Sequence, residues 1–485
     1  MLKPNDTFKT VRLSYSINDE ERKYVMARKT LIKKWLKDQG IYCELEDVPN
    51  IALLGSGGGE RAAVGMLGSL HQLAQDNLLD SLLYMCGVSG TTWCMSSLYS
   101  DPALSLSERC DEMIKKLKGS TVDLSKAVEW LKLRKEQNQD FNLTDFWGAF
   151  TASYFIKEVS LWLYSHIIKP YPIYSAIELD WVWFEMTPHE SGFSGLGAFV
   201  PTSCLGSKFE GGTLREKRKE MDMVLLQGGE RIDTQTLLIM CISYFLGLSG
   251  RHFTLGTPDS PKPSPREPLP KKLRCFLVTL FGYIHNSWLM RSDFARHRHL
   301  LTCQGHCYTN VPSSMASKEK IHLVDAGLKI NSPYPPVLRT SRDVDLIISL
   351  DFSAGDPFET VFRAKDYARQ QKVPFPPVKE SVREEKDHPR DCYVFEGRRP
   401  EEPTIMHMPL FNLQNCQGLR LSKLKFSLNT RQMLLPSICI SHYIVQINSA
   451  PNQTGDNPIH KGAEKWQVHY AGQNPKPNKS TDRRV

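Results

Sequence analysis

Two short apolar runs, each ended abruptly by glycines, stand in the first hundred residues of the chain. The first, Ile51 to Leu54, stops at the glycine-rich stretch 55–59, and apolar residues at helical spacing follow it. The second, Leu82 to Cys86, stops at the stretch 87–91, and another helical pattern follows. Each copy predicts a buried strand, a tight turn and a helix, so Ser89 is expected at a strand-to-helix elbow.

Residues 19–39 predict an amphipathic helix that begins at Asn18 or Asp19. Its apolar residues form one broad face, and basic residues cover the remainder. A basic amphipathic helix can lie on an anionic membrane, but such a stripe more often packs on the core of a globular protein. We favour packing on the core. The basic residues are Arg22, Lys23, Arg28, Lys29, Lys33, Lys34 and Lys37.

The rest of the pattern predicts an α/β domain. Residues 100–210 look mostly helical, with clustered aromatics that are expected in the core or along a long apolar tunnel. Strands are predicted at Ile321 to Val324 and at Val344 to Phe352, and a helix at Phe358 to Gln371. We therefore expect a sheet flanked by helices.

Residues 210–320 hold two apolar runs on either side of a proline-rich linker. The runs, 237–248 and 275–284, are shorter than the roughly 20 residues that span a bilayer, so no transmembrane helix is predicted. Buried helices are the favoured interpretation, and a membrane-touching lid is the alternative. A group of potential zinc ligands also lies here, but its spacing matches no closed site and arginines surround it, so we expect no metal. These ligands are His297, His299, Cys303, His306 and Cys307.

Composition narrows the class of protein. The 485 residues are 41% hydrophobic, which allows a large core in one or two domains. A net charge of +8 is mild for this length and favours anionic surfaces over a nucleic-acid groove, so no nucleic acid is expected. The N-terminus lacks the apolar region of a secretory signal, so the protein is expected inside the cell, with its twelve cysteines reduced.

The elbow at Ser89 has a chemical interpretation, because a nucleophilic serine needs a strained turn with small neighbours. Gly87 and Gly90 supply them, although Thr91 departs from the hydrolase pattern G-x-S-x-G. The glycine-rich turn could present backbone N–H groups to an oxyanion at a helix N-terminus. The competing interpretation, a nucleotide-binding loop, fits poorly: Glu60 replaces its third glycine, and the Gly-Lys-Ser/Thr of a P-loop is missing.

Three motifs resemble those of the group IV cytosolic phospholipase A2 family. Residues 57–61 read GGGER, residues 87–93 read GVSGTTW and residues 324–328 read VDAGL. They are similar to the glycine loop, the nucleophile motif and the aspartate motif of the family. The resemblance covers roughly residues 45–210 and 320–415 and is strongest to the gamma-type, calcium-independent branch. Further matches lie at 142–147, 183–189, 197–199, 206–209 and 350–358.

The resemblance implies a three-layer patatin/cytosolic-phospholipase-like fold, with a central sheet, flanking helices and inserted cap or lid elements. It divides the chain into an N-terminal segment (1–45) with the basic helix and a catalytic domain (46–415) with a variable region (210–320). A divergent tail (416–485), partly of disordered composition, follows.

The resemblance also implies a mechanism. Asp325, at the end of a predicted strand, acts as general base for Ser89 in a Ser-Asp dyad, and Gly57, Gly58 and Gly59 form the oxyanion hole. Arg61 and Arg342 match arginines that matter for activity, and a guanidinium can pair two phosphate oxygens at once. Arg342 is the better candidate for that contact. Arg61 could equally hold the loop or a neighbouring carboxylate.

The function so implied is calcium-independent phospholipase A2 and lysophospholipase activity through an acyl-serine, with transacylation as a further activity and no cofactor. The expected partners are glycerophospholipids, lysophospholipids and the surface of an intracellular membrane, such as the endoplasmic reticulum, approached from the cytoplasm. The alternative is an inactive or unstable variant that acts as a membrane or protein interaction module. The altered region 210–320 and the divergent tail favour that alternative, whereas the retained dyad and arginines favour the enzyme.

Overall fold

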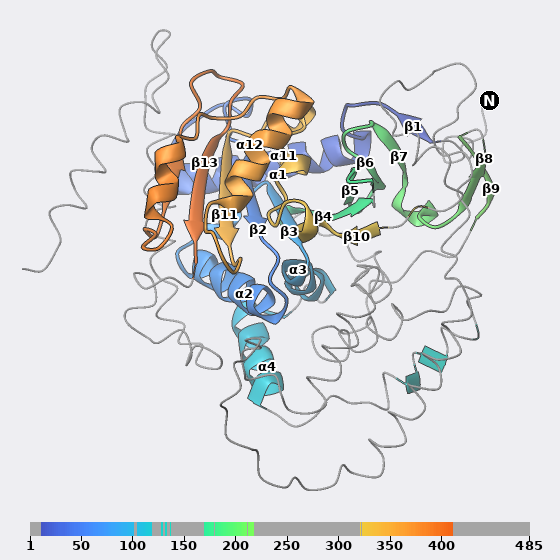
Figure 1. Cartoon of the computed structure of the whole chain (residues 1–485), viewed down its shortest axis with the longest axis horizontal. Helices are drawn as coiled ribbons and strands as arrows, with labels where there is room; N and C mark the ends of the chain where they lie inside the picture. Colours follow the sequence, from blue (N-terminus) through green and yellow to red (C-terminus); the bar gives the residue numbers. More distant parts are fainter. Residues whose placement is uncertain are drawn as a thin grey trace, which may run out of the picture.

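The computed structural model describes residues 11–100, 104–118, 128–129, 131–132, 136, 169–178, 180–210, 212–217, 321 and 323–410. One mixed sheet of eleven strands forms the centre of this part of the chain, and helices surround it (Figure 1). The candidate zinc ligands, the two apolar runs of the region 210–320 and the tail 416–485 lie outside the described residues.

The strands fall into a parallel centre and antiparallel edges. In chain order they are β1 (Arg12–Leu13), β2 (Ile51–Gly55), β3 (Tyr84–Val88), β4 (Tyr171–Glu178), β5 (Trp183–Met186), β6 (Glu190–Phe193), β7 (Ala198–Pro201), β8 (Lys208–Glu210), β9 (Thr213–Glu216), β10 (Leu323–Asp325), β11 (Leu346–Asp351), β12 (Tyr393–Phe395) and β13 (Thr404–Pro409). The order in the large sheet is β1-β7-β6-β5-β4-β3-β2-β11-β13-β12, and β10 pairs with β4. Neighbours from β4 to β13 run parallel. The strands β8 and β9 form a separate hairpin.

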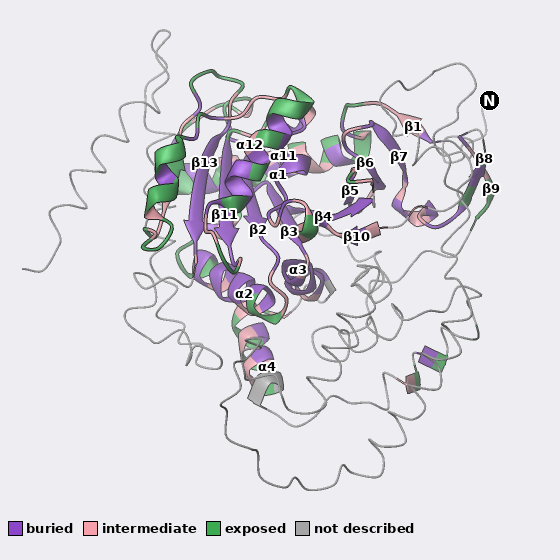
Figure 2. Ribbon diagram, in the orientation of Figure 1, coloured by how far each residue is buried: buried purple, intermediate pink, exposed green. Residues whose placement is uncertain are grey.

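The parallel strands are buried along their whole length. Every residue of β2, β3, β4, β11 and β13 is buried, as expected for strands covered on both faces (Figure 2). This explains why their sequences read as continuous apolar runs rather than as alternating patterns. The strands predicted at 51–54 and 344–352 are confirmed as β2 and β11. The strand predicted at 82–86 lies two residues later, as β3.

Helices lie in the crossover connections between these parallel strands. The helices are α1 (Asp19–Asp38), α2 (Glu60–Gln75), α3 (Gly90–Ser100), α4 (Leu106–Lys118), α11 (Tyr334–Val337) and α12 (Glu359–Gln371). The crossover from β2 to β3 and that from β11 to β13 run in opposite directions across the sheet. Because parallel crossovers are right-handed, α2 and α12 belong on opposite faces. Figure 1 shows α12 in front of β11, with α2 and α3 beyond the arrowheads of β11 and β13.

The predicted N-terminal helix is confirmed as α1, and it packs on the core. Asn18 caps it by accepting from the N–H groups of Glu20 and Glu21. Ile32, Trp35 and Leu36 belong to the main hydrophobic core. One basic residue departs from the prediction: Arg28 is buried and donates to the carbonyl groups of Leu82 and Asp80. This arginine therefore ties α1 to the start of β3 instead of facing solvent.

The prediction of mostly helix over residues 100–210 is wrong for its described C-terminal part. Six strands, β4 to β9, occupy residues 171–216. Most of them are four residues or shorter, and tight turns connect them. So short a run shows no clear alternation of apolar and polar residues, which hides the strands from a pattern search.

Candidate active site

Ser89 occupies the single residue between β3 and α3. Its φ angle is +53°, a left-handed conformation that is uncommon for a residue other than glycine. It is partly exposed, although Val88 and Gly90 on either side are buried. A methyl group at Gly90 would lie 1.9 Å from the carbonyl oxygen of Gly59, so only glycine fits there. The elbow predicted at Ser89 is therefore present, and it packs directly against the glycine loop, residues 55–59.

Thr91, which stands where the pattern G-x-S-x-G has its last glycine, stabilises the elbow. It is buried, and its hydroxyl accepts from the Val88 N–H at 3.0 Å and reaches the Gly55 carbonyl at 2.8 Å. One side chain thus joins the ends of β2 and β3. A methyl group at Gly55 would lie 2.8 Å from Cγ2 of Thr91, so threonine fills the space that a small residue would leave.

The glycine loop runs from β2 into the N-terminus of α2. Gly58 and Gly59 have φ angles of +152° and +59°, which favour glycine. The N–H of Gly57 donates to the Asn331 carbonyl at 2.9 Å. Within the described part of the chain, neither Gly58 nor Gly59 donates a backbone hydrogen bond. Gly57 is therefore held by the fold, whereas the other two N–H groups are available at a helix N-terminus.

Asp325 meets the elbow along one edge of β4. The strand β3 pairs in parallel with β4 up to Val88 opposite Ser175, and β10 pairs antiparallel with β4 up to Asp325 opposite Ala176. Because β5 occupies the other edge of β4 at these positions, β3 and β10 share an edge and approach head to head. Asp325 thus stands at the register position next after Val88. Its carboxylate accepts from the Gly327 N–H at 2.7 Å, which fixes the turn after the strand.

Asn331 and Ser353 lie with Ser89, Asp325 and the glycine loop, and neither was predicted from the sequence as a site residue. The side-chain amide of Asn331 donates to the Gly57 carbonyl at 3.1 Å and to Oγ of Ser353 at 2.6 Å. A methyl group at Gly57 would lie 3.0 Å from Cβ of Ser89, so Asn331 holds the loop beside the serine. No local signal distinguishes Asn331 from an ordinary asparagine in a turn.

Arg61 lies at the rim of the same group. Its Nε donates to the Phe352 carbonyl at 2.9 Å, and a methyl group at Gly58 would lie 3.1 Å from its terminal nitrogen. The residue is exposed. The guanidinium therefore ties the loop to the end of β11 while leaving donors toward solvent.

Arg342, the better candidate for a phosphate contact from the sequence, has no hydrogen-bond donor free for one. Its side chain is fully buried, and each of its five N–H donors has an acceptor within the protein. Glu21 and Glu185 accept two bonds each, and the Pro336 carbonyl accepts the fifth. No donor remains for a substrate. Arg342 instead joins α1, β5 and the turn before β11.

The acidic partners of Arg342 come from distant parts of the chain. Glu185 lies on β5 and also accepts from Arg339 and Ser194. Burial alone would raise the pKa of Glu185, but the charges of Arg339 and Arg342 lower it to about 2. The carboxylate is therefore ionised at neutral pH. A glutamate inside a strand of Trp, Phe and Met was the available signal for a buried ion pair.

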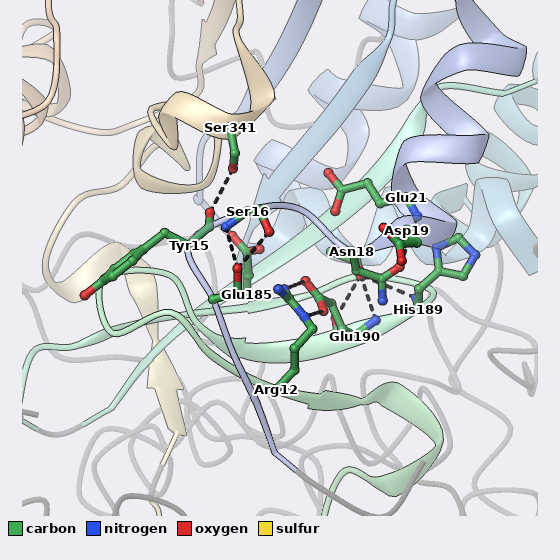
Figure 3. A network of polar contacts seen from close by, with 12 residues as sticks. Arg12, Tyr15, Ser16, Asn18, Asp19, Glu21, Glu185, His189, Glu190 and Ser341 are labelled. Carbon is green, nitrogen blue, oxygen red and sulfur yellow. Dashed lines mark hydrogen bonds and ion pairs between the residues drawn. The ribbon is translucent and has the colours of Figure 1, made fainter. Parts of the chain in front are cut away.

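A second ion pair lies at the same end of the sheet. Arg12 on β1 makes two hydrogen bonds to Glu190 on β6, at 2.9 and 2.6 Å. Figure 3 shows this pair together with the Ser341 hydroxyl, which donates to the Tyr15 carbonyl. The N-terminal arm, residues 11–18, is thus fixed to the sheet by polar contacts at several points.

The described residues hold neither a membrane-spanning helix nor a cluster of potential metal ligands. None of the helices there is long and apolar enough to cross a bilayer. In the same ranges, no three residues of metal-ligand type lie close enough together to hold an ion.

The chain is similar to known phospholipases. A family model described as the lysophospholipase catalytic domain matches residues 51–228. Human cytosolic phospholipase A2 gamma is 31% identical over 479 residues, which cover 83% of this chain and 86% of the relative. Human cytosolic phospholipase A2 zeta is also 31% identical, but this chain spans only 54% of its length. The structure of human GIVD cytosolic phospholipase A2 superposes with a TM-score of 0.69 at 24% identity, covering 90% of this chain and 66% of that one.

Proposed function

Because the chain belongs to the cytosolic phospholipase A2 family, we propose that it hydrolyses acyl esters of glycerophospholipids with Ser89 as nucleophile and Asp325 as base. The observation that carries the proposal is the head-to-head approach of β3 and β10, which puts Asp325 at the register position next after Val88, the residue before Ser89. The left-handed backbone at Ser89 adds support, because such strain gathers at functional sites.

In the proposed reaction, Asp325 takes the proton from Oγ of Ser89 as that oxygen attacks the ester carbonyl. The carbonyl oxygen becomes negatively charged and accepts from the N–H groups of Gly58 and Gly59. Gly57 has a different role from the one predicted, because its N–H is already bonded to Asn331. One donor of this kind is worth about 3 kcal/mol of transition-state stabilisation in other serine enzymes.

The tetrahedral intermediate then collapses. The C–O bond to the glycerol breaks, protonated Asp325 returns its proton to the leaving oxygen, and a lysophospholipid departs. Water attacks the acyl-serine while Asp325 takes one of its protons; the bond from the acyl carbon to Oγ then breaks, Asp325 returns the proton to Ser89, and the fatty acid is released. A lysophospholipid in place of water would give transacylation, and one in place of the diacyl substrate would give lysophospholipase activity.

In this proposal, Arg61 binds the phosphate group of the substrate. Arg61 is exposed at the glycine loop and has donors directed to solvent, whereas Arg342 has none left. A guanidinium can pair two phosphate oxygens at once. None of these steps uses a metal ion, so the proposed reaction is independent of calcium. We place it at the cytoplasmic surface of intracellular membranes, including the endoplasmic reticulum.

The test is fatty-acid release from phosphatidylcholine and lysophosphatidylcholine vesicles in excess chelator. The full-length protein is compared with Ser89→Ala, Asp325→Asn and Arg61→Met, each matched by circular dichroism. We expect a loss of at least about 10³-fold for the first two. For Arg61→Met we expect a loss that is larger for phospholipid than for a phosphate-free ester. Folded parent protein that releases no fatty acid would overturn the proposal.

A further inference from the structure

The glycine loop is held by a residue that comes from the other half of the chain. Asn331 lies six residues after Asp325, and it bonds both backbone groups of Gly57. Its carbonyl accepts from the Gly57 N–H at 2.9 Å, and its Nδ2 donates to the Gly57 carbonyl at 3.1 Å. A single residue therefore fixes Gly57 from both sides.

The orientation of the Asn331 amide follows from its partners. The Gly57 carbonyl can only accept, so the nitrogen of the amide must face it. The same nitrogen donates to Oγ of Ser353 at 2.6 Å, and the Ser353 N–H donates to the buried Asp351 carboxylate at 2.9 Å. This chain of bonds anchors the amide to the end of β11. The amide therefore cannot rotate without breaking two hydrogen bonds.

The oxygen of the same amide lies between the two halves of the candidate site. A methyl group would come within 2.5 Å of Oδ1 at Gly57 and within 2.6 Å at Gly327. Gly57 is the neighbour of Ser89, and Gly327 donates to the Asp325 carboxylate. Asn331 thus contacts both the loop beside the nucleophile and the turn that holds the base.

We propose that Asn331 is a positioning residue, whose side-chain amide sets the distance between the glycine loop and the turn of Asp325. It need not touch the substrate. It acts by keeping the N–H groups of Gly58 and Gly59 where the oxyanion forms, and such donors stabilise a transition state only when they are already in place. The inference rests on the proposed hydrolase function.

The test uses four full-length variants. Asn331→Ala removes the amide, and Asn331→Asp keeps its volume but removes both N–H donors. Ser353→Ala removes only the anchor of the amide. Ser341→Ala is the control, because its hydroxyl also bonds a backbone carbonyl, but that of Tyr15 in the N-terminal arm, away from the glycine loop. Two rates are measured on each: hydrolysis of a short activated ester, and phosphonylation of Ser89 by an alkyl fluorophosphonate, followed by intact-protein mass.

We expect both Asn331 variants to lower kcat for the ester and the phosphonylation rate about 10- to 100-fold, with KM within about threefold. Ser353→Ala should lose about threefold to tenfold, and Ser341→Ala should match the parent. The inference is overturned if Asn331→Asp keeps parental rates. It is equally overturned if the variants lose only thermal stability, or if KM alone rises. Should Asn331→Ala fail to fold, the Asp and Ser353 variants decide.

The two proposals can fail separately. A parent that is phosphonylated at Ser89 but releases no fatty acid from vesicles refutes the lipid hydrolase, while the phosphonylation rates still test Asn331. A parent that releases no fatty acid and is not phosphonylated at Ser89 refutes both the lipid hydrolase and the role of Asn331.

Discussion

At the scale of single residues, the close packing of glycines is the most demanding feature of the site. A side chain at Gly90 would overlap the Gly59 carbonyl oxygen, and nothing nearby can move except the loop itself. By contrast, a methyl group at Gly195 would meet only the end of Gln371, at 3.5 Å, and Gly195 has no special backbone conformation. The two positions differ in the space that surrounds them, not in residue type.

We therefore predict that Gly90→Ala displaces the glycine loop. Phosphonylation of Ser89 should slow by at least about 100-fold, and the variant should lose roughly 1–3 kcal/mol of stability. Gly195→Ala should match the parent in both measurements. Parental labelling of Gly90→Ala would contradict the described contact between Gly90 and Gly59.

Single residues also show what a motif can and cannot predict. The elbow at Ser89 follows from local sequence, because small neighbours and an apolar run are both visible there. The role of Arg342 does not follow, because its partners Glu21 and Glu185 lie 321 and 157 residues away. A motif identifies that an arginine matters but not whether it faces substrate or core. The same holds for Asn331, whose partner Gly57 is 274 residues distant.

At the scale of elements, the hydroxyl of Thr91 joins the ends of two neighbouring strands. We predict that Thr91→Val, which keeps the shape but removes the hydroxyl, leaves the buried Val88 N–H without an acceptor. That loss should cost about 1–3 kcal/mol in thermal or urea unfolding and should lower kcat. Thr91→Ser should restore most of both. Equal behaviour of the Val and Ser variants would show that the methyl group, not the hydroxyl, matters.

Elements with strong local boundaries were the predictable ones. The strands β2 and β11 and the helices α1 and α12 were found to within about two residues, because glycines, a cap or a long apolar run marks their ends. The strands β4 to β9 were missed because their pairing, not their composition, makes them strands. The place of Asp325 beside Ser89 depends on β10 pairing with β4, which no window of sequence contains.

At the scale of the whole molecule, Arg342 connects α1, β5 and the turn before β11. We predict that Arg342→Met destabilises the protein by about 3–5 kcal/mol, because it leaves Glu21 buried without its arginine. The matched control is Arg369→Met, which removes an exposed pair with Asp366 and should change stability by less than about 1 kcal/mol. Similar unfolding midpoints for the two variants would contradict the prediction.

The same network predicts how stability depends on pH. The pKa of Glu185 is lowered to about 2 by its two arginines, from an ordinary value of 4.5. The ionised Glu185 carboxylate therefore stabilises the fold fully above pH 4.5, and this contribution is lost as the pH falls toward 2 and the carboxylate takes up a proton. The free energy of unfolding, measured by urea titration, should therefore fall over that range by on the order of 3 kcal/mol more for the parent than for Glu185→Gln. Glu380→Gln, at an exposed pair, should keep the parental slope. Equal slopes for the parent and Glu185→Gln would refute the assignment.

The head-to-head meeting of β3 and β10 also has a consequence for protein synthesis. Ser89 leaves the ribosome early, whereas Asp325 and Asn331 follow more than 200 residues later. At 5–20 residues per second, that interval lasts on the order of ten to fifty seconds. During this time the nascent chain carries Ser89 without Asp325 and without Asn331, which holds the glycine loop. Under the proposed mechanism, the enzyme therefore stays inactive until about two-thirds of its 485 residues have been made.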